Sequence, residues 1–210
     1  MSLICERFTT SKLTTYSDLQ QISTYGFRGE ALASISMIAR LTIQTKTRND
    51  VCAYRAQYEN GNLVDEPKAC AGNQGTQIII EDLFYNVPIK LKALKIPSDE
   101  FQRIFDVVAR YAVHNYTVSF CLKKYGENNS IKTQPSTSPT DNIRTIYGNV
   151  VANSLLPFEY EATDLKFKVN GLMTNANHNS KKMQFLLFIN HRLVESKCKS
   201  SKWKIMIYII

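Results

Sequence analysis

The chain has 210 residues, of which 44% are hydrophobic and 10% aromatic, enough to bury the core of one large domain or two small ones. Its formal net charge of +8 suggests a nucleic-acid partner, but four lysines at positions 197–204 supply half of that charge. Residues 1–196 carry a surplus of four, which does not predict a strongly basic, nucleic-acid-coating protein. The composition indicates a globular protein.

Cysteine usage and the start of the sequence point to a reducing compartment. The five cysteines are odd in number, and none forms a C-x-x-C pair, so they indicate neither a zinc site nor a disulfide framework. Met1 to Thr10 lacks the apolar core of a signal peptide, and no apolar run reaches the roughly twenty residues of a membrane span. We expect a cytosolic or nuclear protein with ordinary reduced cysteines: Cys5, Cys52, Cys70, Cys121 and Cys198.

The first part of the sequence predicts a loop, a helix and antiparallel strands. In the stretch STYGFRGEALASIS, residues 23–36, two glycines flank an arginine, and the apolar spacing that follows predicts a helix over Glu30–Arg40. Alternation of apolar and polar residues predicts a strand over Leu41–Thr47. Asn60-Gly61, between the strand-like runs Cys52–Tyr58 and Leu63-Val64, predicts a hairpin.

A second cycle of strand and helix follows. Gln77–Phe84 reads as a buried strand, and Ser98–Asn115 as an amphipathic helix with Ser98 as its N-cap. Thr117–Lys123 alternates as a strand. The stretch Glu127–Asn142 is rich in Ser, Thr, Asn and Pro, so we expect a linker and a domain boundary near it.

The last part predicts a small second domain and an unusual tail. Asp141 is expected to cap a short helix, and two strand-like runs follow, Leu165–Leu172 and Met183–Ile189. The final residues, Ile205–Ile210, are apolar with no polar alternation. Such a run is either a strand that lacks its sheet or an aggregation-prone tail.

The glycine-flanked arginine predicts an anion site. A helix N-terminus offers unpaired N–H groups and partial positive charge, and glycines let the backbone approach a phosphate. Three further features favour a nucleotide: the cluster Thr9-Thr10-Ser11-Lys12, a second glycine turn at Gly72–Thr76, and the nearby Lys46. Each could instead be an ordinary capped turn. Neither a Walker A loop nor a G-x-G-x-x-G fingerprint occurs.

Five stretches of this sequence carry a family resemblance. ERFTTSKL, STYGFRGEALASIS, CAGNQGTQIIIEDLFYNVP, DNIRTIYGN and FLLFINHRLVES resemble the N-terminal region of MutL mismatch-repair proteins, in the eukaryotic MutL homologue 1 branch. The resemblance covers Cys5 to about Ser196. It implies an α+β fold: a partial two-layer α/β-sandwich ATPase domain, with a mixed sheet under helices, followed by part of a gyrase-like α+β transducer domain.

The same resemblance implies a domain division and a nucleotide site. We expect an incomplete ATPase domain over 1–134, the first part of a transducer over 135–196, and a divergent tail over 197–210. The segment GFRGEAL resembles the ATP lid, which in this family couples nucleotide state to contact between two N-terminal domains. The implied nucleotide-binding residues are Thr10, Ser11, Lys12, Gly26, Phe27, Arg28, Gly29, Glu30, Ala31, Leu32, Gly75 and Thr76.

The chain also departs from the family pattern. The family's ATPase begins with Glu-x-x-x-Asn, which supplies the general base and a Mg²⁺ ligand, and continues with Asp-x-Gly-x-Gly, which reads adenine; neither occurs ahead of Cys5. The transducer motif Asn-Val-His-Pro-x-Lys, whose lysine reaches the γ-phosphate, is absent too. We expect no catalytic or metal-binding residue in this chain, and no ATP hydrolysis by the family mechanism, although ATP and Mg²⁺ belong to the complete family protein.

Several partners and alternatives follow from the resemblance. It implies a nuclear protein that pairs with a MutL paralogue, works with a MutS-type mismatch-recognition complex, and contacts DNA weakly without reading its sequence. A nonhydrolytic module that binds a MutL paralogue or DNA is the alternative. A histidine kinase of the same superfamily needs a phosphoacceptor, whereas His114, His178 and His191 read as structural or solvated. We also expect exposed apolar surface along Ser34–Ile43 and elsewhere, and poor folding in isolation.

Overall fold

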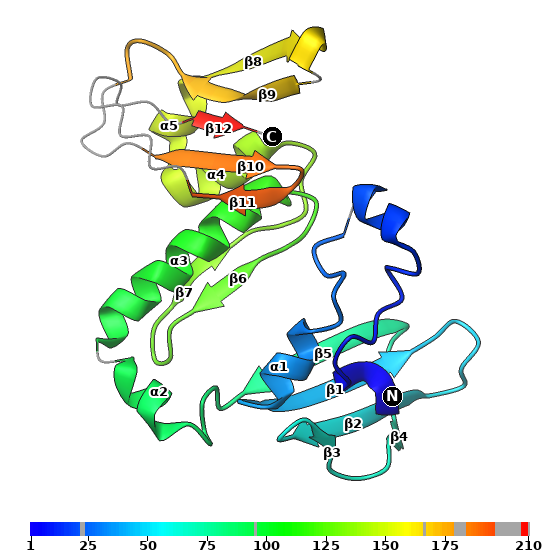
Figure 1. The fold of residues 1–210 in the computed structure, drawn as a ribbon. Coiled ribbons are helices and arrows are strands. Elements are labelled where there is room, and N and C mark those ends of the chain that lie inside the picture. Colours follow the sequence, from blue (N-terminus) through cyan, green and yellow to red (C-terminus); the bar gives the residue numbers. More distant parts are fainter. Residues whose placement is uncertain (22–23, 95, 166, 179–183, 196–206, 210) are drawn as a thin grey trace. The chain divides into compact units, whose positions relative to one another are not determined.

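The computed structural model describes residues 1–21, 24–94, 96–165, 167–178, 184–195 and 207–209. The chain divides into two compact units, Met1–Lys95 and Ile96–Ile210 (Figure 1). Each unit combines helices with sheets of largely antiparallel strands, so the predicted α+β class is confirmed. No helix in the described part of the chain is long and apolar enough to cross a membrane.

Unit 1 is built on a five-stranded antiparallel sheet of order β3-β2-β1-β5, with β4 also paired to β2. The predicted hairpin turn joins β2 to β3, with positive φ at Asn60 (51°) and Gly61 (80°), as a tight two-residue turn requires. The strands are β1 (Arg40–Lys46), β2 (Ala53–Glu59), β3 (Asn62–Leu63), β4 (Lys68–Cys70) and β5 (Gly75–Glu81).

Four short helices accompany this sheet among the described residues of unit 1. They are η1 (Ser2–Cys5), η2 (Tyr16–Gln21), α1 (Ala31–Ser36) and α2 (Pro88–Ala93). The predicted helix Glu30–Arg40 is therefore too long. The Ser36 carbonyl accepts from the Gly61 N–H at 3.1 Å and the Ile38 carbonyl from the Phe84 N–H at 2.6 Å, so these carbonyls bond to distant segments rather than to a further helical turn.

The core of unit 1 lies on one face of the sheet. Alternation along β1 places Leu41 and Ile43 on that face, where each is 1% exposed. The rest of the buried cluster comes from η1 and β2: Cys5, Ala56 and Tyr58.

The same face is uncovered at its β5 edge. Register pairs Ile78 with Ile43 and Ile80 with Leu41, yet Ile78 and Ile80 are 45% and 46% exposed. The predicted exposure along Ser34–Ile43 is thus wrong for the strand residues Leu41 and Ile43, because residues of η1 pack against them. Exposed apolar side chains lie instead on β5, the strand next to β1, at Ile78 and Ile80.

Unit 2 contains a five-stranded sheet of order β11-β10-β12-β9-β8 and a separate β6-β7 pair. Its core cluster joins α3, α4, α5 and β10 through Val113, Ile143, Ala152, Leu186 and Phe188. The elements are α3 (Pro97–His114), β6 (Cys121–Lys123), β7 (Asn129–Lys132), α4 (Pro139–Tyr147), α5 (Asn149–Asn153), β8 (Leu155–Ala162), η3 (Thr163–Leu165), β9 (Phe167–Thr174), β10 (Phe185–Ile189), β11 (Arg192–Val194) and β12 (Ile207–Ile209).

Proline sets the starts of both longer helices of unit 2, which corrects two predicted caps. Helix α3 starts at Pro97 rather than after Ser98, with Ile96 in the N-cap position. Helix α4 starts at Pro139, and its cap is Ser138, whose Oγ accepts from the Thr140 N–H at 3.2 Å. Proline is favoured at a first helical position because its missing N–H has no helical partner there.

The predicted linker and its boundary differ from the observed division of the chain. Strand β7 lies inside the predicted linker and pairs with β6, which is itself confined to the end of the predicted strand Thr117–Lys123. The two units separate after Lys95. The assignment of 1–134 to an ATPase domain and 135–196 to a transducer stays a prediction.

The C-terminal tail supplies a strand. Ile207–Ile209 pairs in parallel with β10 and antiparallel with β9, so the predicted strand does not lack its sheet. The other tail residues, 197–206 and 210, lie outside the described residues.

Two histidines of unit 2 meet between the end of α3 and the β10–β11 turn. His114 is 8% exposed, its Nε2 lies 3.2 Å from Nδ1 of His191, and its ring stacks on Phe188 with centroids 3.9 Å apart. Burial, and secondly the charge of His191, lower the pKa of His114 from 6.5 to about 4. His114 is therefore a packed residue of the core, in agreement with the structural reading of its sequence position.

This depressed pKa predicts acid-sensitive stability. The folded state takes up the His114 proton only near pH 4, whereas the unfolded state does so near 6.5. Stability is complete above about pH 6.5 and falls by about 2 to 3 kcal/mol as the pH drops to about 4. Urea unfolding of the chain from pH 7.5 to 4 measures this loss. We expect His114→Gln to remove most of the loss and His178→Asn to retain it; equal pH dependence in both variants would contradict the assignment.

Candidate functional site

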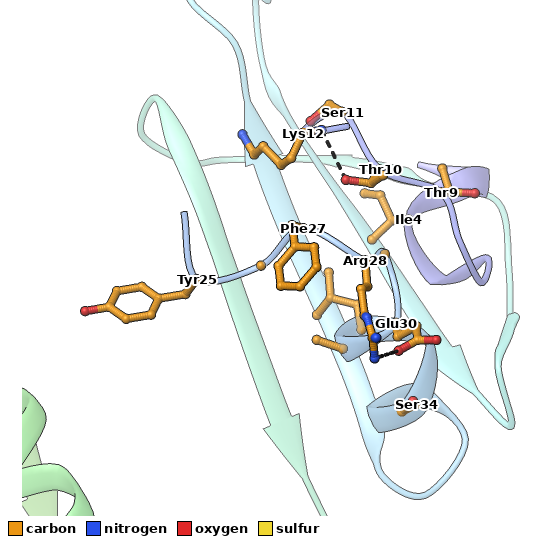
Figure 2. Close-up of a pocket in the computed structure, with 14 residues that line it drawn as sticks. Ile4, Thr9, Thr10, Ser11, Lys12, Tyr25, Phe27, Arg28, Glu30 and Ser34 are labelled. Carbon is orange, nitrogen blue, oxygen red and sulfur yellow. Dashed lines mark hydrogen bonds and ion pairs between the residues drawn. The ribbon is translucent and has the colours of Figure 1, made fainter. Parts of the chain in front are cut away.

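A cavity of about 500 Å³ in unit 1 is lined by two segments that lie apart in the sequence (Figure 2). One is the Thr9–Lys12 segment, which follows η1. The other is the glycine loop, Tyr25–Leu32, which leads into α1. We call this space the loop cavity. Most of the predicted nucleotide-binding residues line it.

The structure brings most of the predicted nucleotide residues together at the loop cavity. Thr10, Ser11 and Lys12 line it, as does the whole stretch Gly26–Leu32. Gly75 and Thr76 do not. They line a separate hollow of about 390 Å³ with Gln44 and residues 72–74 and 77, where the Thr76 and Thr45 hydroxyls lie 2.8 Å apart.

The two glycines of the loop have different roles. Gly29 has φ +66°, and a Cβ there would lie 2.3 Å from the carbonyl oxygen of Thr9. A Cβ on Gly26 would meet no heavy atom within 4 Å beyond its chain neighbours, and the φ of Gly26 is not positive. A glycine is therefore required at position 29, where the glycine loop closely approaches the Thr9–Lys12 segment. At position 26, neither the backbone conformation nor the surrounding space requires a glycine.

The charges around the loop cavity are mixed. Nη1 of Arg28 lies 3.8 Å from Oε2 of Glu30, and the Arg28 guanidinium lies 5.9 Å from the centre of the Phe27 ring. The Arg28–Glu30 pair is drawn in Figure 2 and is largely exposed, so it is worth little. Lys12 has no ion-pair partner among the residues that the structure describes, and its backbone N–H donates to Oγ1 of Thr10 at 3.1 Å. The cavity therefore presents one cation that an anion can reach without breaking an ion pair.

Backbone amides add to this polarity. Helix α1 begins at Ala31, and the Glu30 side chain makes no capping hydrogen bond to it. Its first N–H groups are consequently not used by a side-chain cap, which leaves them available to an oxygen ligand. With only six residues, α1 has a small dipole, so the amides themselves matter more than the helix field.

Sequence reasoning missed part of the cavity wall. Ile4, Tyr25 and Ser34 line the loop cavity but were not in the predicted set, and Thr9 was named only as part of the cluster Thr9–Lys12. The contact that involves Thr9 is made by its backbone, against Gly29. A G-x-x-G pattern can suggest that a glycine has a positive φ. The pattern does not indicate which distant segment that glycine contacts.

The described residues do not form a metal centre. In the parts of the chain that are placed, no group of three or more His, Cys, Asp or Glu side chains lies close enough to hold a metal ion. Glu30 is the one carboxylate at the loop cavity, and it faces Arg28. Because Mg²⁺ prefers carboxylates together with phosphate oxygens and water, this donor set does not fit a protein-held Mg²⁺ site.

Comparisons with known proteins identify the family. Residues 143–205 match the family model described as DNA mismatch repair protein, C-terminal domain. The chain is 48% identical over 198 residues to DNA mismatch repair protein MLH1 of Saccharomyces cerevisiae, covering 92% of this chain and 26% of that protein. It is 46% identical over 204 residues to the putative MutL protein homolog 1 of Schizosaccharomyces pombe, covering 92% and 30%. The chain thus spans between a quarter and a third of these relatives.

Solved structures share the fold. The chain superposes on the Aquifex aeolicus MutL ATPase domain complexed with ADP with a TM-score of 0.67, at 19% identity, over 93% of this chain and 75% of that one. The N-terminal domain of a DNA repair protein gives a TM-score of 0.69 at 24% identity, over 93% and 61%. The predicted resemblance is confirmed: the chain belongs to the MutL/MLH1 family of DNA mismatch repair proteins.

Proposed function

We propose that the loop cavity binds the phosphate groups of ATP and that this chain supplies the ATP-binding, lid-bearing part of a MutL-type mismatch-repair protein. The observation that carries the proposal is the meeting of the Thr9–Lys12 segment with the glycine loop around one cavity. Cations, hydroxyls and unpaired amides are the groups that phosphate oxygens use. The ADP complex of the A. aeolicus MutL domain, which has the same fold, supports the choice of nucleotide.

Each group at the cavity has a distinct part in this proposal. Lys12 supplies a reachable positive charge, and the hydroxyls of Thr10 and Ser11 donate to oxygens. Arg28 binds a phosphate only when that phosphate displaces the Glu30 carboxylate from the Arg28 guanidinium. Occupation of the cavity would then bias the position of the glycine loop, and that bias is the proposed link between nucleotide state and contact between N-terminal domains.

The proposal covers binding and not hydrolysis by these 210 residues. Hydrolysis requires a group that activates water and a metal that neutralises the phosphates. The resemblance assigns both to a Glu-x-x-x-Asn pattern, which is not part of the loop cavity. We therefore assign phosphate binding to this cavity and no step of hydrolysis.

The biological setting is proposed from the relatives. They are named as DNA mismatch repair proteins of the MutL and MLH1 type. We propose that the complete protein acts in the nucleus as a heterodimer with a MutL paralogue, together with a MutS-type complex and with weak, sequence-independent DNA contact. The alternative, a nonhydrolytic module that binds a partner, is favoured by one observation: the exposed apolar strip of Ile78 and Ile80 on edge strand β5.

A pair of lysine substitutions tests the phosphate site. Lys12→Ala removes the cation of the loop cavity, and we expect ATP affinity, measured by calorimetric titration, to fall about tenfold, because hydrogen bonds to charged groups contribute about 1.5 to 3 kcal/mol. The matched control is Lys46→Ala: the sequence suggested this lysine near the nucleotide, but it does not line the loop cavity, and its Nζ donates to the Val51 carbonyl at 3.1 Å. Equal losses in both variants, or none in Lys12→Ala, would refute the site.

A further inference from the structure

The second sheet is apolar on both of its faces. Leu186 and Phe188 of β10 belong to the core cluster of unit 2, to which α3, α4 and α5 also contribute. Side chains alternate along a strand, so Leu187 and Ile189 lie on the opposite face. We call this opposite side the outer face. The strand pairing places on it, besides these two residues of β10, Leu156 and Tyr160 of β8 and Phe167 of β9.

Large side chains of the outer face are open to solvent. Tyr160 is 61% exposed, Ile189 53%, and Leu156 and Phe167 52% each. None of them belongs to the core cluster or to the partly buried residues that pack against it. Within the described part of unit 2, the core helices therefore pack against the sheet from its other side.

The sequence of these strands is that of a sheet with a layer on each side. Strand β10 reads Phe-Leu-Leu-Phe-Ile, apolar at every position, which is typical of strands buried on both faces. In the β8–β9 hairpin, the charged residues Glu159, Glu161 and Lys168 occupy helix-side positions, and the outer positions are apolar. A sheet with one wet face has the reverse arrangement. The pattern therefore indicates a second layer on the outer face.

We propose that the outer face is an interface between two copies of this chain, which pack sheet against sheet and need no nucleotide to do so. Two sheets that meet in this way lie about 10 Å apart, and their side chains interdigitate. The contact uses unit 2 alone. It is therefore independent of the phosphate site proposed for unit 1.

The width of the outer face favours a sheet over a helix as the covering layer. The second sheet has five strands. At a spacing of about 4.8 Å, they make a face roughly 24 Å wide. A helix with its side chains is only about 10 to 12 Å across, so one helix covers less than half of this width. The same sheet of a second copy covers all of it.

The charge of the outer face favours a second copy over a different protein. Alternation along the described strands β8 to β11 places one charged residue on it, Arg192 in the edge strand β11. A partner selected by complementary charge would find little to recognise there. In a two-fold contact each face meets an identical face, so an almost uncharged surface avoids like-charge repulsion.

The size of the outer face predicts a weak dimer. Its strands are three to eight residues long. The face therefore measures roughly 24 by 18 Å, and two copies cover about 900 Å² in total. This area is at the low end of specific contacts and well below that of obligate dimers. We expect a reversible dimer with a dissociation constant of about 10 to 100 μM.

Sedimentation equilibrium of the full chain without nucleotide tests the interface. From about 1 to 300 μM, we expect the mean mass to rise from that of a monomer toward that of a dimer. Tyr160→Lys combined with Phe167→Lys should raise the dissociation constant about tenfold or more, because each change puts a charge into an apolar contact. The matched control combines Tyr125→Lys with Val150→Lys, two exposed positions of unit 2 away from the outer face, and should dimerise like the parent chain.

Three outcomes of this experiment overturn the proposal. The first is a parent chain that stays monomeric over the whole range. The second is an equal dissociation constant in the two double variants. The third is a dimer that forms only when ATP is added, which would assign the contact to the nucleotide-coupled part of unit 1.

Hydroxyl-radical footprinting of the parent chain locates the contact without any substitution. Tyr160 and Phe167 should be oxidised more slowly at about 300 μM than at about 1 μM, because the dimer covers them. Tyr125, which is fully exposed, should be oxidised equally at both concentrations. Slow oxidation of Tyr160 and Phe167 at both concentrations would mean that the chain covers its own outer face. Fast oxidation at both, in a chain that dimerises, would place the contact elsewhere. Either result overturns the proposal.

Discussion

Gly29→Ala is expected to lower ATP affinity by at least about tenfold and to release the Thr9–Lys12 segment from the glycine loop. Two costs combine at this position. An alanine at φ +66° adopts the left-handed region, which costs about 1 to 2 kcal/mol, and its Cβ would lie 2.3 Å from the Thr9 carbonyl oxygen. Relief of such overpacking by backbone movement costs about 1 to 3 kcal/mol more. The segment that moves carries Lys12, so the cavity loses its reachable cation.

The matched control is Gly26→Ala in the same loop. Gly26 has open space around it and no positive φ, so this variant should bind ATP within about twofold of the parent chain. Calorimetric titration measures affinity, and the rate of tryptic cleavage after Lys12 reports release of the segment without any nucleotide. A Gly29→Ala chain with parental cleavage rate and parental affinity would show that the contact with Thr9 does not hold the site together.

The elements that could be predicted from the sequence are those whose signal is local. The Asn60-Gly61 turn, the alternation of β1 and the amphipathic α3 each depend on residues within one element, and each forms where it was expected. Helix boundaries were less accurate, because Pro97 and Pro139 start helices one or two residues before the polar caps that were predicted. The end of α1 could not be predicted, since it depends on hydrogen bonds from Gly61 and Phe84.

The candidate site, too, could be predicted where its signal is local and not where it depends on contacts between distant segments. Its residue types and the GFRGEAL motif were read from the sequence, and most of them line one cavity. The separation of Gly75 and Thr76 from that cavity, and the approach of Gly29 to Thr9, depend on how distant segments pack. The place of Ile207–Ile209 in the second sheet is likewise a matter of long-range pairing, for which an apolar run alone gives no register.

The largest loss of stability is expected from Phe188→Ala in unit 2. Phe188 is 1% exposed, stacks on His114 at 3.9 Å with an interplanar angle of 6°, and meets Tyr111 edge-on at 5.8 Å. Removal of a buried aromatic ring costs about 3 to 5 kcal/mol, a large part of the roughly 5 to 15 kcal/mol that a typical domain has. We expect the thermal midpoint of the chain to fall by about 10 °C or more.

The same substitution should alter the titration of His114, because burial is the main cause that lowers the pKa of this group to about 4. With the Phe188 ring gone, water reaches the imidazole, and its pKa should rise toward the ordinary 6.5, as a nuclear magnetic resonance titration would measure. Tyr125→Ala, which removes a fully exposed aromatic ring from the same unit, should change neither the melting temperature nor this pKa. A Phe188→Ala chain that melts like the Tyr125→Ala control, or that keeps the low His114 pKa, would mean that the ring does not shield the histidine pair.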